Sequence, residues 1–217
     1  MVAGFPTLKA LCAALALAGV LVLGGCADLP EITGKEKLAA ATPAGPLAGA
    51  GEVYLLRGGF NIFSTGMDEL AAKLRARGVD AYSYGHAQWR ELAADARQRY
   101  LANHGPIILV GHSWGAVGVV LMARELARTS TPVALVVLYD STDAVTVPAN
   151  VKRVINLRSK AAIGAHITVT GGYGFGGVID VEDRPEYGHL NMDNAPALHE
   201  ETIADVLQIL QKPRTKR

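Results

Sequence analysis

From about residue 51 onward, short apolar runs alternate with longer stretches in which the apolar side chains recur every three or four residues. The short runs, such as 106–110, are hydrophobic without interruption, and this pattern predicts strands that are buried on both faces of a sheet. In the first long stretch, Met67, Leu70 and Leu74 fall on one face of a helix. The sequence therefore predicts strands and helices in alternation.

Such alternation is typical of an α/β fold, in which helices cover both faces of a mostly parallel central sheet. The pattern contains no internal repeat and no sign of a second folded domain, so we expect a single domain over residues 51–212. The predicted strands are 53–56, 79–84, 106–110, 132–139 and 151–158, and the predicted helices are 66–78, 89–105, 114–128 and 195–211.

The first 50 residues have neither the strand pattern nor the helix pattern of apolar positions. A short start with one lysine leads into an apolar run, Ala10 to Leu23, and then into Leu-Gly-Gly-Cys ending at Cys26. This order is typical of a secretory signal peptide, and the cysteine after Leu-Gly-Gly resembles the lipobox of bacterial lipoproteins. We therefore expect residues 1–25 to be a lipoprotein signal peptide and Cys26 to receive a lipid. The alternatives are a plain signal peptide and a membrane-spanning anchor.

Residues 26–50 are rich in Ala, Gly and Pro and have no sustained period, so they are predicted to be the lipidated cysteine followed by a flexible tether. This organisation places the protein in the bacterial cell envelope, bound to the membrane by a lipid anchor and facing the periplasm. Residues 213–217 are predicted to be a short basic tail.

Composition narrows the function classes. Half of the residues are hydrophobic, 19% are charged and the net charge is +1, which suits a packed core and offers no basic face for nucleic acid. The two cysteines, Cys12 and Cys26, lie within and directly after the predicted signal peptide. The mature domain is therefore expected to have no disulfide, no cysteine metal site and no thiol nucleophile.

The junction between strand 106–110 and the following helix carries Gly111-His112-Ser113-Trp114-Gly115, which fits G-x-S-x-G. Between a strand and a helix this pattern indicates a nucleophile elbow, a sharp turn that projects the serine Oγ above the sheet. Side chains at the two glycine positions would collide with the neighbouring strand and helix. The alternative interpretation is a glycine-rich turn with a capping serine.

A serine nucleophile needs a general base. His189 lies in a polar loop just before the last predicted helix, from where it can reach back over the ends of the strands. His112 is expected to point away from Ser113, and His199 is expected to pack inside the last helix. The remaining histidines have surface or loop interpretations, and they are His86, His104 and His166.

The base in turn needs a carboxylate to orient it. Asp140 directly follows the strand 132–139, where the backbone is held firmly, and we select it for this role. Asp143, three residues later, and Asp193, four residues after His189, remain alternatives.

Backbone N–H groups are needed to stabilise an oxyanion. The N–H of Trp114, the residue after Ser113, is one expected donor. The loop Arg57-Gly58-Gly59-Phe60 after the first strand supplies the second, from Gly59 or Phe60. An ordinary glycine turn is the alternative interpretation of this loop.

Two further patterns bear on ligand binding. The stretch 172–177 matches G-x-G-x-x-G but does not lie between a strand and a helix, so no dinucleotide site is predicted, and 169–177 is expected to be a mobile loop near the pocket. His189 and Asp193 could ligate a metal, but a third ligand is not apparent. We therefore predict no metal and no cofactor.

Together, the glycine loop after the first strand, G-H-S-W-G, the later aspartate and the histidine before a terminal helix resemble the α/β-hydrolase family over residues 51–211. The resemblance implies a Ser-His-acid triad that transfers an acyl group to water. Many members carry His-Gly where this chain has Arg57-Gly58. In most members the acid follows the next strand, whereas Leu138-Tyr139-Asp140 is similar to the lipase-like variant, without its proline.

The sequence therefore predicts a lipid-anchored serine hydrolase that cleaves small carboxylic ester or thioester substrates with Ser113, His189 and Asp140. The short connection before His189 leaves room for a small loop cover and not for a large helical cap, so an open site is expected. One alternative is an acyltransferase with the same triad. Another is a non-catalytic envelope lipoprotein that binds an acyl ligand or a protein.

Overall fold

A computed structural model of the chain describes residues 51–59, 64–160 and 167–211. The predictions for the signal peptide, the lipidated Cys26, the tether and the basic tail lie outside these residues, as do Phe60 and His166. Within the described ranges, no helix has both the length and the apolar character needed to cross a membrane.

The central sheet has six strands, in the order β2-β1-β3-β4-β6-β8, and every neighbouring pair is parallel. The carboxyl ends of all six strands therefore lie at the same end of the sheet. The residues predicted to be functional lie at this end. The prediction of an α/β fold with a mostly parallel sheet is confirmed. The strands are β1 (Glu52–Arg57), β2 (Asp80–Gly85), β3 (Ile107–His112), β4 (Leu135–Tyr139), β6 (Arg153–Ser159) and β8 (Val178–Arg184).

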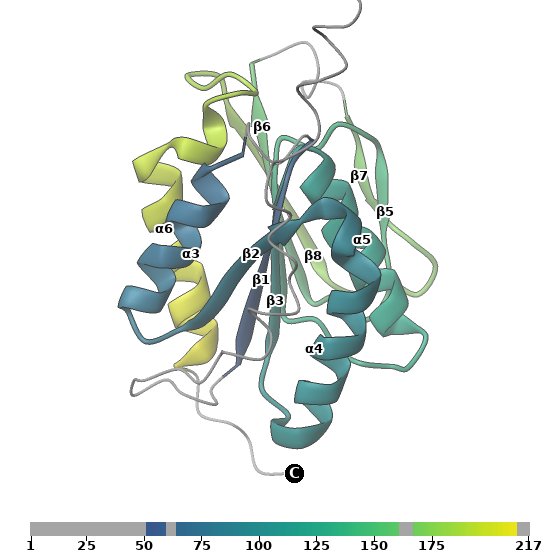
Figure 1. Cartoon of the computed structure of the whole chain (residues 1–217). Helices are drawn as coiled ribbons and strands as arrows, with labels where there is room; N and C mark the ends of the chain where they lie inside the picture. The colour runs from purple at the N-terminus through teal and green to yellow at the C-terminus, as the bar shows by residue number, and fades with distance from the viewer. Residues whose placement is uncertain (1–50, 60–63, 161–166, 212–217) are drawn as a thin grey trace, which may run out of the picture. The chain divides into compact units, whose positions relative to one another are not determined.

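Helices cover both faces of the sheet, as Figure 1 shows. Helices α3 (Gly66–Ala76) and α6 (Pro196–Leu210) pack on one face, and α4 (Trp89–Asn103) and α5 (Trp114–Ala127) pack on the other. Successive residues of a strand face opposite sides, so in β1 Leu55 belongs to the core under α3 and Leu56 to the core under α5. This two-sided burial explains why the central strands are continuously apolar.

The sequence missed three strands. β8 is half-exposed at the edge of the sheet, and its acidic residues pair with arginines of β6, as Asp180 does with Arg153. It therefore lacks the apolar run by which the inner strands were found. A second sheet pairs β5 (Val145–Val147) with β7 (Val169–Gly171). The expectation of a mobile loop over 169–177 is wrong in this respect, because its first residues form β7 and Phe175 packs against the core under α5.

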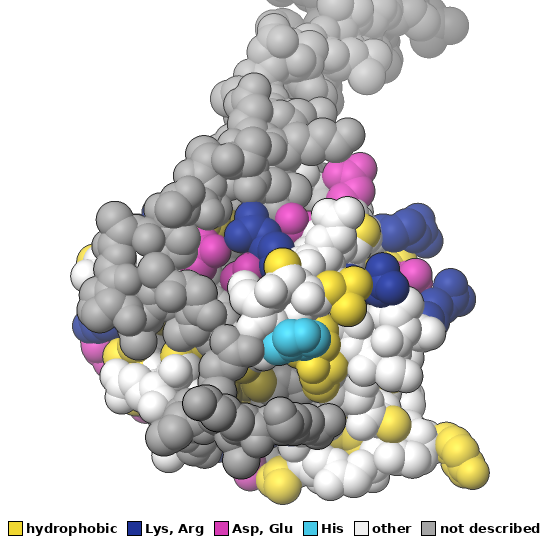
Figure 2. All heavy atoms as spheres, turned by 90° about the horizontal axis from the view of Figure 1, so that it is seen from below, with side chains coloured by type: hydrophobic (Ala, Val, Ile, Leu, Met, Phe, Trp, Pro, Cys, Tyr) yellow, Lys and Arg dark blue, Asp and Glu magenta, His cyan; other side chains and the backbone are white. Residues whose placement is uncertain are grey.

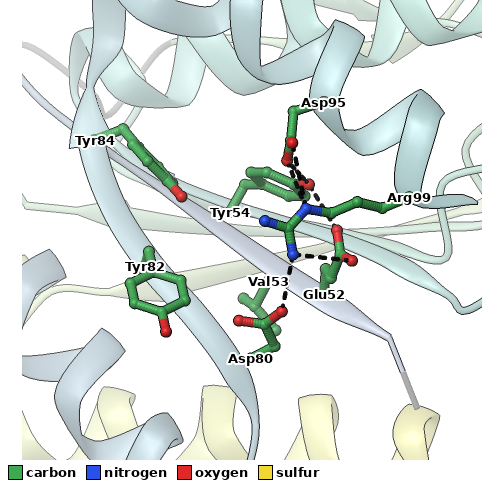
Figure 3. A pocket seen from close by; sticks show the side chains of 8 residues that line it. All are labelled: Glu52, Val53, Tyr54, Asp80, Tyr82, Tyr84, Asp95 and Arg99. Atoms are coloured by element: carbon green, nitrogen blue, oxygen red, sulfur yellow. Dashed lines mark hydrogen bonds and ion pairs between the residues drawn. The ribbon is translucent and has the colours of Figure 1, made fainter. Parts of the chain in front are cut away.

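A cluster of charged side chains lies where β1 and β2 begin. Arg99 of α4 bridges three carboxylates, with Nη1 3.2 Å from Asp80 Oδ2 and 3.5 Å from Glu52 Oε1, and Nε 3.0 Å from Asp95 Oδ2 (Figure 3). Tyr54 Oη lies 2.6 Å from Glu52 Oε2 and 2.7 Å from Asp95 Oδ2. This amino-end cluster ties α4 to the sheet. Figure 2 shows the same end of the domain, and both positive and negative side chains lie on its surface.

Candidate active site

Ser113 lies on a sharp turn between β3 and α5. Its backbone has φ 59° and ψ −122°, outside the range that residues with a side chain ordinarily adopt. A Cβ at Gly111 would collide with the carbonyl of Gly115, and a Cβ at Gly115 would collide with the carbonyl of Leu56 in β1. Both glycines are therefore required for the close approach of strand and helix that this turn creates, as the motif predicted.

The three side chains selected from the sequence come together above the ends of β3 and β4. Oγ of Ser113 lies 3.1 Å from Nε2 of His189, and Nδ1 of the same ring lies 2.7 Å from Oδ2 of Asp140. Because the carboxylate accepts the proton on Nδ1, Nε2 is left as the acceptor that faces the serine hydroxyl. The arrangement has the geometry needed to move a proton from Ser113 to His189.

Asp140 is held by the neighbouring strand β6 as well as by its own. It directly follows β4 with φ 47°, and its carboxylate accepts the Ser159 N–H at 2.9 Å and the Ser159 hydroxyl at 2.7 Å. Burial by itself would raise the pKa of Asp140, but the hydrogen bonds from His189 and Ser159 outweigh it, so the pKa lies below its ordinary value. Asp140 is therefore a fixed negative charge beside the imidazole.

The two alternative carboxylates lie elsewhere. Asp143 accepts the Thr142 hydroxyl at 3.2 Å, and its side chain faces a groove beside α5. Asp193 is fully buried, and its carboxylate accepts the N–H of Gly66 at 3.1 Å, where α3 begins. Burial raises the pKa of Asp193 to about 6. Of the three carboxylates that the sequence left open, only Asp140 bonds the His189 ring.

His189 is carried by the connection between β8 and α6, as its position in the chain predicted. The described residues between β4 and His189 form strands and connections without a helix, in keeping with the expected absence of a large helical cap. Leu190, which follows His189 in the chain, is 68% exposed, and Trp114, which follows Ser113, is 46% exposed. A large, exposed apolar side chain therefore directly follows both Ser113 and His189 in the chain.

His112 has contacts that the sequence analysis did not anticipate. The side chain is buried, with Nδ1 2.8 Å from Ser64 Oγ and Nε2 2.9 Å from the carbonyl oxygen of His189. The carbonyl can only accept, so Nε2 carries the proton and Nδ1 accepts from the Ser64 hydroxyl. Ser64 Oγ in turn accepts the N–H of Gly58 at 2.9 Å. This hydrogen-bonded chain joins the glycine loop, the elbow and the loop that carries His189.

Burial lowers the pKa of His112 to about 4, which keeps its ring neutral and preserves this tautomer at neutral pH. A histidine directly before the nucleophile and a serine soon after the glycine loop were visible in the sequence. Nothing in the sequence indicated that they meet, because 48 residues separate them.

The expected oxyanion donors lie at the amino end of α5 and in the glycine loop. The Gly58 N–H is already used by Ser64, and the Ser113 N–H donates to the carbonyl of Tyr139 at 3.0 Å. A Cβ at Gly59 would come within 2.9 Å of the Trp114 ring, so this loop packs directly against the start of α5. The Trp114 and Gly59 N–H groups remain the expected pair, and the alternative donor Phe60 lies outside the described residues.

Of the other described histidines, His86 packs edge-on against the Trp114 ring, with 5.4 Å between the ring centroids, and His199 and His104 have contacts elsewhere. His199 is fully buried in α6 as expected, with Nε2 2.5 Å from the Asp193 carbonyl and Nδ1 3.1 Å from Lys73 Nζ. His104 follows the last residue of α4 in a left-handed conformation, near the amino ends of the strands. Among the described side chains, no group of three or more His, Cys, Asp or Glu is arranged to hold a metal ion.

A sequence profile described as the alpha/beta hydrolase family matches residues 49–214, which is most of the chain. The chain belongs to the alpha/beta hydrolase family. The predictions of this family and of a hydrolase are thereby confirmed. No protein with a curated description matches the chain in sequence.

Solved structures of similar fold include thioesterases and hydrolases. The thioesterase domain SrfTE, which cyclizes the lipopeptide antibiotic surfactin, is 14% identical, with 75% of this chain and 92% of that chain covered and a TM-score of 0.50. The type II thioesterase BorB from the borrelidin biosynthetic cluster is 14% identical, with 78% and 95% covered and a TM-score of 0.48. A putative hydrolase from Pectobacterium atrosepticum is 13% identical, with 74% and 91% covered and a TM-score of 0.45. Identities this low show the fold and nothing of the substrate.

The resemblance to this family implies an acid after the strand that follows β4 in most members, whereas the carboxylate that bonds His189 here directly follows β4. Asp140 follows β4, and the next strand, β6, ends in Ser159, whose N–H and hydroxyl both bind the Asp140 carboxylate. The end of β6 therefore supplies two hydrogen-bond donors to the Asp140 carboxylate.

Proposed function

We propose that the protein hydrolyses carboxylic ester or thioester bonds of small acyl substrates, with Ser113 as nucleophile, His189 as general base and acid, and Asp140 as the carboxylate that orients the imidazole. The observation that carries this proposal is the continuous line of hydrogen bonds from Ser113 through His189 to Asp140 on a strained turn. Backbone strain at a buried nucleophile is costly and is kept where it serves a function.

In the first half of the reaction, Ser113 Oγ attacks the acyl carbon while its proton moves to Nε2 of His189. The tetrahedral intermediate collapses, the bond to the leaving oxygen or sulfur breaks, and the leaving group takes the proton from Nε2. The product of this half is an acyl ester on Ser113 and a free alcohol or thiol.

In the second half, His189 takes a proton from a water molecule, and the water oxygen attacks the acyl ester. The carboxylic acid leaves, and the proton on Nε2 returns to Ser113 Oγ. Asp140 stays ionised throughout and stabilises the imidazolium, in keeping with its lowered pKa. The N–H groups of Trp114 and Gly59 are the proposed donors to the oxyanion, and loss of one such donor typically costs about 10²–10³ in rate.

The same proposal places the enzyme in the bacterial envelope, held by a lipid on Cys26 with residues 27–50 as a tether. This part rests on the sequence pattern alone. The expected result is incorporation of a fatty-acid label into the full chain and its loss in Cys26→Ser, while labelling of the Cys12→Ser chain persists. Equal labelling of both variants would contradict lipidation at Cys26.

The catalytic proposal is tested by reacting the full chain, in mild detergent, with a fluorophosphonate probe that labels activated serines. Labelling is expected for the wild type and for His104→Asn, a histidine change at the opposite edge of the sheet. In Ser113→Ala no labelling is expected, and in His189→Ala the labelling rate should fall at least about a thousandfold.

If a folded wild-type chain does not react, Ser113 is not an activated nucleophile. The non-catalytic lipoprotein that binds an acyl ligand then becomes the better interpretation. If the probe reacts but esters and thioesters are turned over only when a second alcohol or amine is added, the acyltransferase interpretation replaces hydrolysis.

A further inference from the structure

A groove with a volume of about 220 Å³ begins at the residue next to the nucleophile. Its floor is one face of α5, where Trp114, Val117 and Leu121 follow each other at helical spacing. Its wall comes from the short segment before α4 and the start of that helix, including Ala87 and Trp89. No step of the mechanism above uses these side chains, because Trp114 contributes only its backbone N–H to it.

The lining of this α5 groove suits an uncharged hydrocarbon chain. Most of it is aromatic or aliphatic, and its two titratable side chains are His86 and Asp143. None of the residues that line it is Lys or Arg, so a phosphate or a free carboxylate would meet the carboxylate of Asp143 without a compensating cation. Val117 and Leu121 are half-buried, which leaves apolar surface for a ligand to cover.

The stereochemistry of the reaction indicates which part of the substrate would lie there. In the tetrahedral intermediate the carbon bears Ser113 Oγ, the oxyanion, the leaving group and the acyl chain. The leaving group must face Nε2 of His189 to receive its proton, and His189 comes from the connection to α6, which packs on the opposite face of the sheet from α5. The acyl chain is the substituent that points away from His189, and the α5 groove lies on that side.

We propose that the α5 groove binds the alkyl chain of the acyl group and makes the enzyme selective for straight acyl chains of medium length. This inference rests on the hydrolase function proposed above. A group the size of a water molecule occupies about 30 Å³, so the groove volume of about 220 Å³ holds about seven groups of that size. A chain of about six to eight carbons fills it.

Two residues on the groove floor allow the chain length to be set by mutation. Along α5, Val117 lies about 4.5 Å and Leu121 about 10.5 Å beyond Trp114, at 1.5 Å per residue. Val117→Trp therefore blocks the groove near its start, and Leu121→Trp blocks it toward its far end. Leu101→Trp on α4 is the matched control, because Leu101 is 54% exposed and does not line the groove.

The test measures kcat/KM of the full chain for p-nitrophenyl esters from acetate to decanoate. For the wild type and Leu101→Trp, kcat/KM should rise about two- to fourfold per methylene up to about six to eight carbons and then level off. In Val117→Trp the rise should end at about four carbons, and in Leu121→Trp it should end between these limits. Unchanged profiles in both groove variants would overturn the proposal.

A second series keeps the acetyl group and lengthens the alcohol, from ethyl to octyl acetate. None of the variants should change this profile. A changed alcohol profile with an unchanged acyl profile would assign the groove to the leaving group instead and overturn the proposal.

Labelling of each variant by a small fluorophosphonate separates the two proposals. Labelling at the wild-type rate shows that the catalytic side chains still work, so any failure then concerns the groove alone. If the wild type itself does not react, the failure lies with the hydrolase function. Should Val117→Trp not fold, Leu121→Trp still tests the shortened profile by itself.

Discussion

Buried carboxyl groups have opposite pKa shifts at the two ends of the central sheet. At the carboxyl end, Asp140 accepts hydrogen bonds from His189 and from both donors of Ser159, and its pKa lies below the ordinary value. At the amino end, burial outweighs the charge of Arg99, and the pKa values of Glu52 and Asp80 are raised. Burial raises the pKa at both ends, so the difference comes from the hydrogen-bond donors that Asp140 receives and from the neighbouring carboxylates that repel each other at the amino end.

Proton counting in the amino-end cluster leads to the same conclusion. Tyr54 has one hydroxyl proton and lies within hydrogen-bonding distance of both Glu52 and Asp95, so both contacts are hydrogen bonds only when one carboxyl group is protonated. One oxygen of Asp80 is buried without a hydrogen-bond partner among the described residues. This end of the sheet has too few donors, whereas each polar atom around Asp140 has a partner of matching type. The comparison indicates that the carboxyl end is built to hold charge and the amino end to tie α4 to the sheet.

The largest expected effect is a loss of activity when the hydrogen bond between Asp140 and His189 at the carboxyl end is changed. Asp140→Asn keeps the shape of the side chain but no longer favours the His189 tautomer with its proton on Nδ1, so kcat should fall about 10³–10⁴-fold. The measurement is hydrolysis of p-nitrophenyl acetate by Asp140→Asn and Asp143→Asn, because an acetyl group is too short to fill the α5 groove that Asp143 lines. The second variant should retain wild-type kcat within about threefold, and the reverse order would assign the acid role to Asp143.

Breaking the amino end should lower stability and leave catalysis alone. Arg99→Met leaves three buried or half-buried carboxylates without their shared cation, which should cost about 2 kcal/mol of unfolding free energy. The loss should be larger at pH 8 than at pH 5, because carboxyl groups with raised pKa values are favoured in their protonated form and are ionised as the pH rises. Urea unfolding at both pH values gives the stability, and kcat of the remaining folded enzyme should equal that of the wild type. A tenfold lower kcat would contradict the separation of the two ends.

The hydrogen-bonded chain through His112 can be cut on either side. In His112→Asn, the amide oxygen can still accept from Ser64 but the side chain cannot reach the His189 carbonyl. In His112→Gln, the amide nitrogen can reach that carbonyl, but the bond to Ser64 is lost. Each variant should lower kcat about tenfold, equivalent to about 1.4 kcal/mol, with KM nearly unchanged.

The two variants differ in what they disturb. His112→Asn should shift the pH dependence of kcat, because it loosens the base, whereas His112→Gln should leave the pH profile in place, because it loosens the glycine loop. Identical pH profiles for the two variants would indicate a purely structural role for His112.

A further effect, on the pH dependence of stability alone, is expected at Asp193, a carboxylate near the active site whose pKa is raised like those of the amino end. Its pKa of about 6 in the folded protein, against an ordinary 3.8, means that the folded state holds the proton more tightly than the unfolded state. Its contribution to stability is therefore complete below about pH 3.8 and is lost as the pH rises through about 6. Asp193→Asn still accepts the Gly66 N–H and cannot ionise, so it should remove about 2 kcal/mol of pH dependence between pH 4 and pH 7. Thermal or urea unfolding from pH 4 to pH 7 measures the difference, and parallel curves for the two proteins would contradict a raised pKa.

Local sequence was sufficient for parts of the site that depend on neighbouring residues. Ser113 was found because the elbow needs glycines two positions away on either side, and both glycines contact backbone that a side chain would displace. Asp140 was selected over Asp143 because a residue directly after a buried strand has a fixed position. His189 was selected from its place in chain order, although the strand that leads to it, β8, was missed because its surface is half polar.

The contacts across long separations could not be obtained in this way. The Ser64–His112 bond, the cap that Asp193 provides to α3 and the two hydrogen bonds from Ser159 to Asp140 each join segments that are distant in the chain. Serine, histidine and aspartate side chains have the same appearance in a sequence whether they face water or each other. The α5 groove was missed for a related reason, since its floor has the same helical spacing as an ordinary buried face.

By itself, the sequence of this protein determined the alternation of strands and helices, the turn that presents Ser113, and the order in which serine, acid and histidine occur. These depend on backbone geometry and on apolar periodicity, which act over a few residues. The sequence favoured Asp140 among three carboxylates, but only the tertiary structure decided that it meets His189, which donors keep it ionised, and on which side of the sheet the α5 groove opens. These depend on parallel strands ending at one edge, which brings residues far apart in the chain within hydrogen-bonding distance while water is excluded.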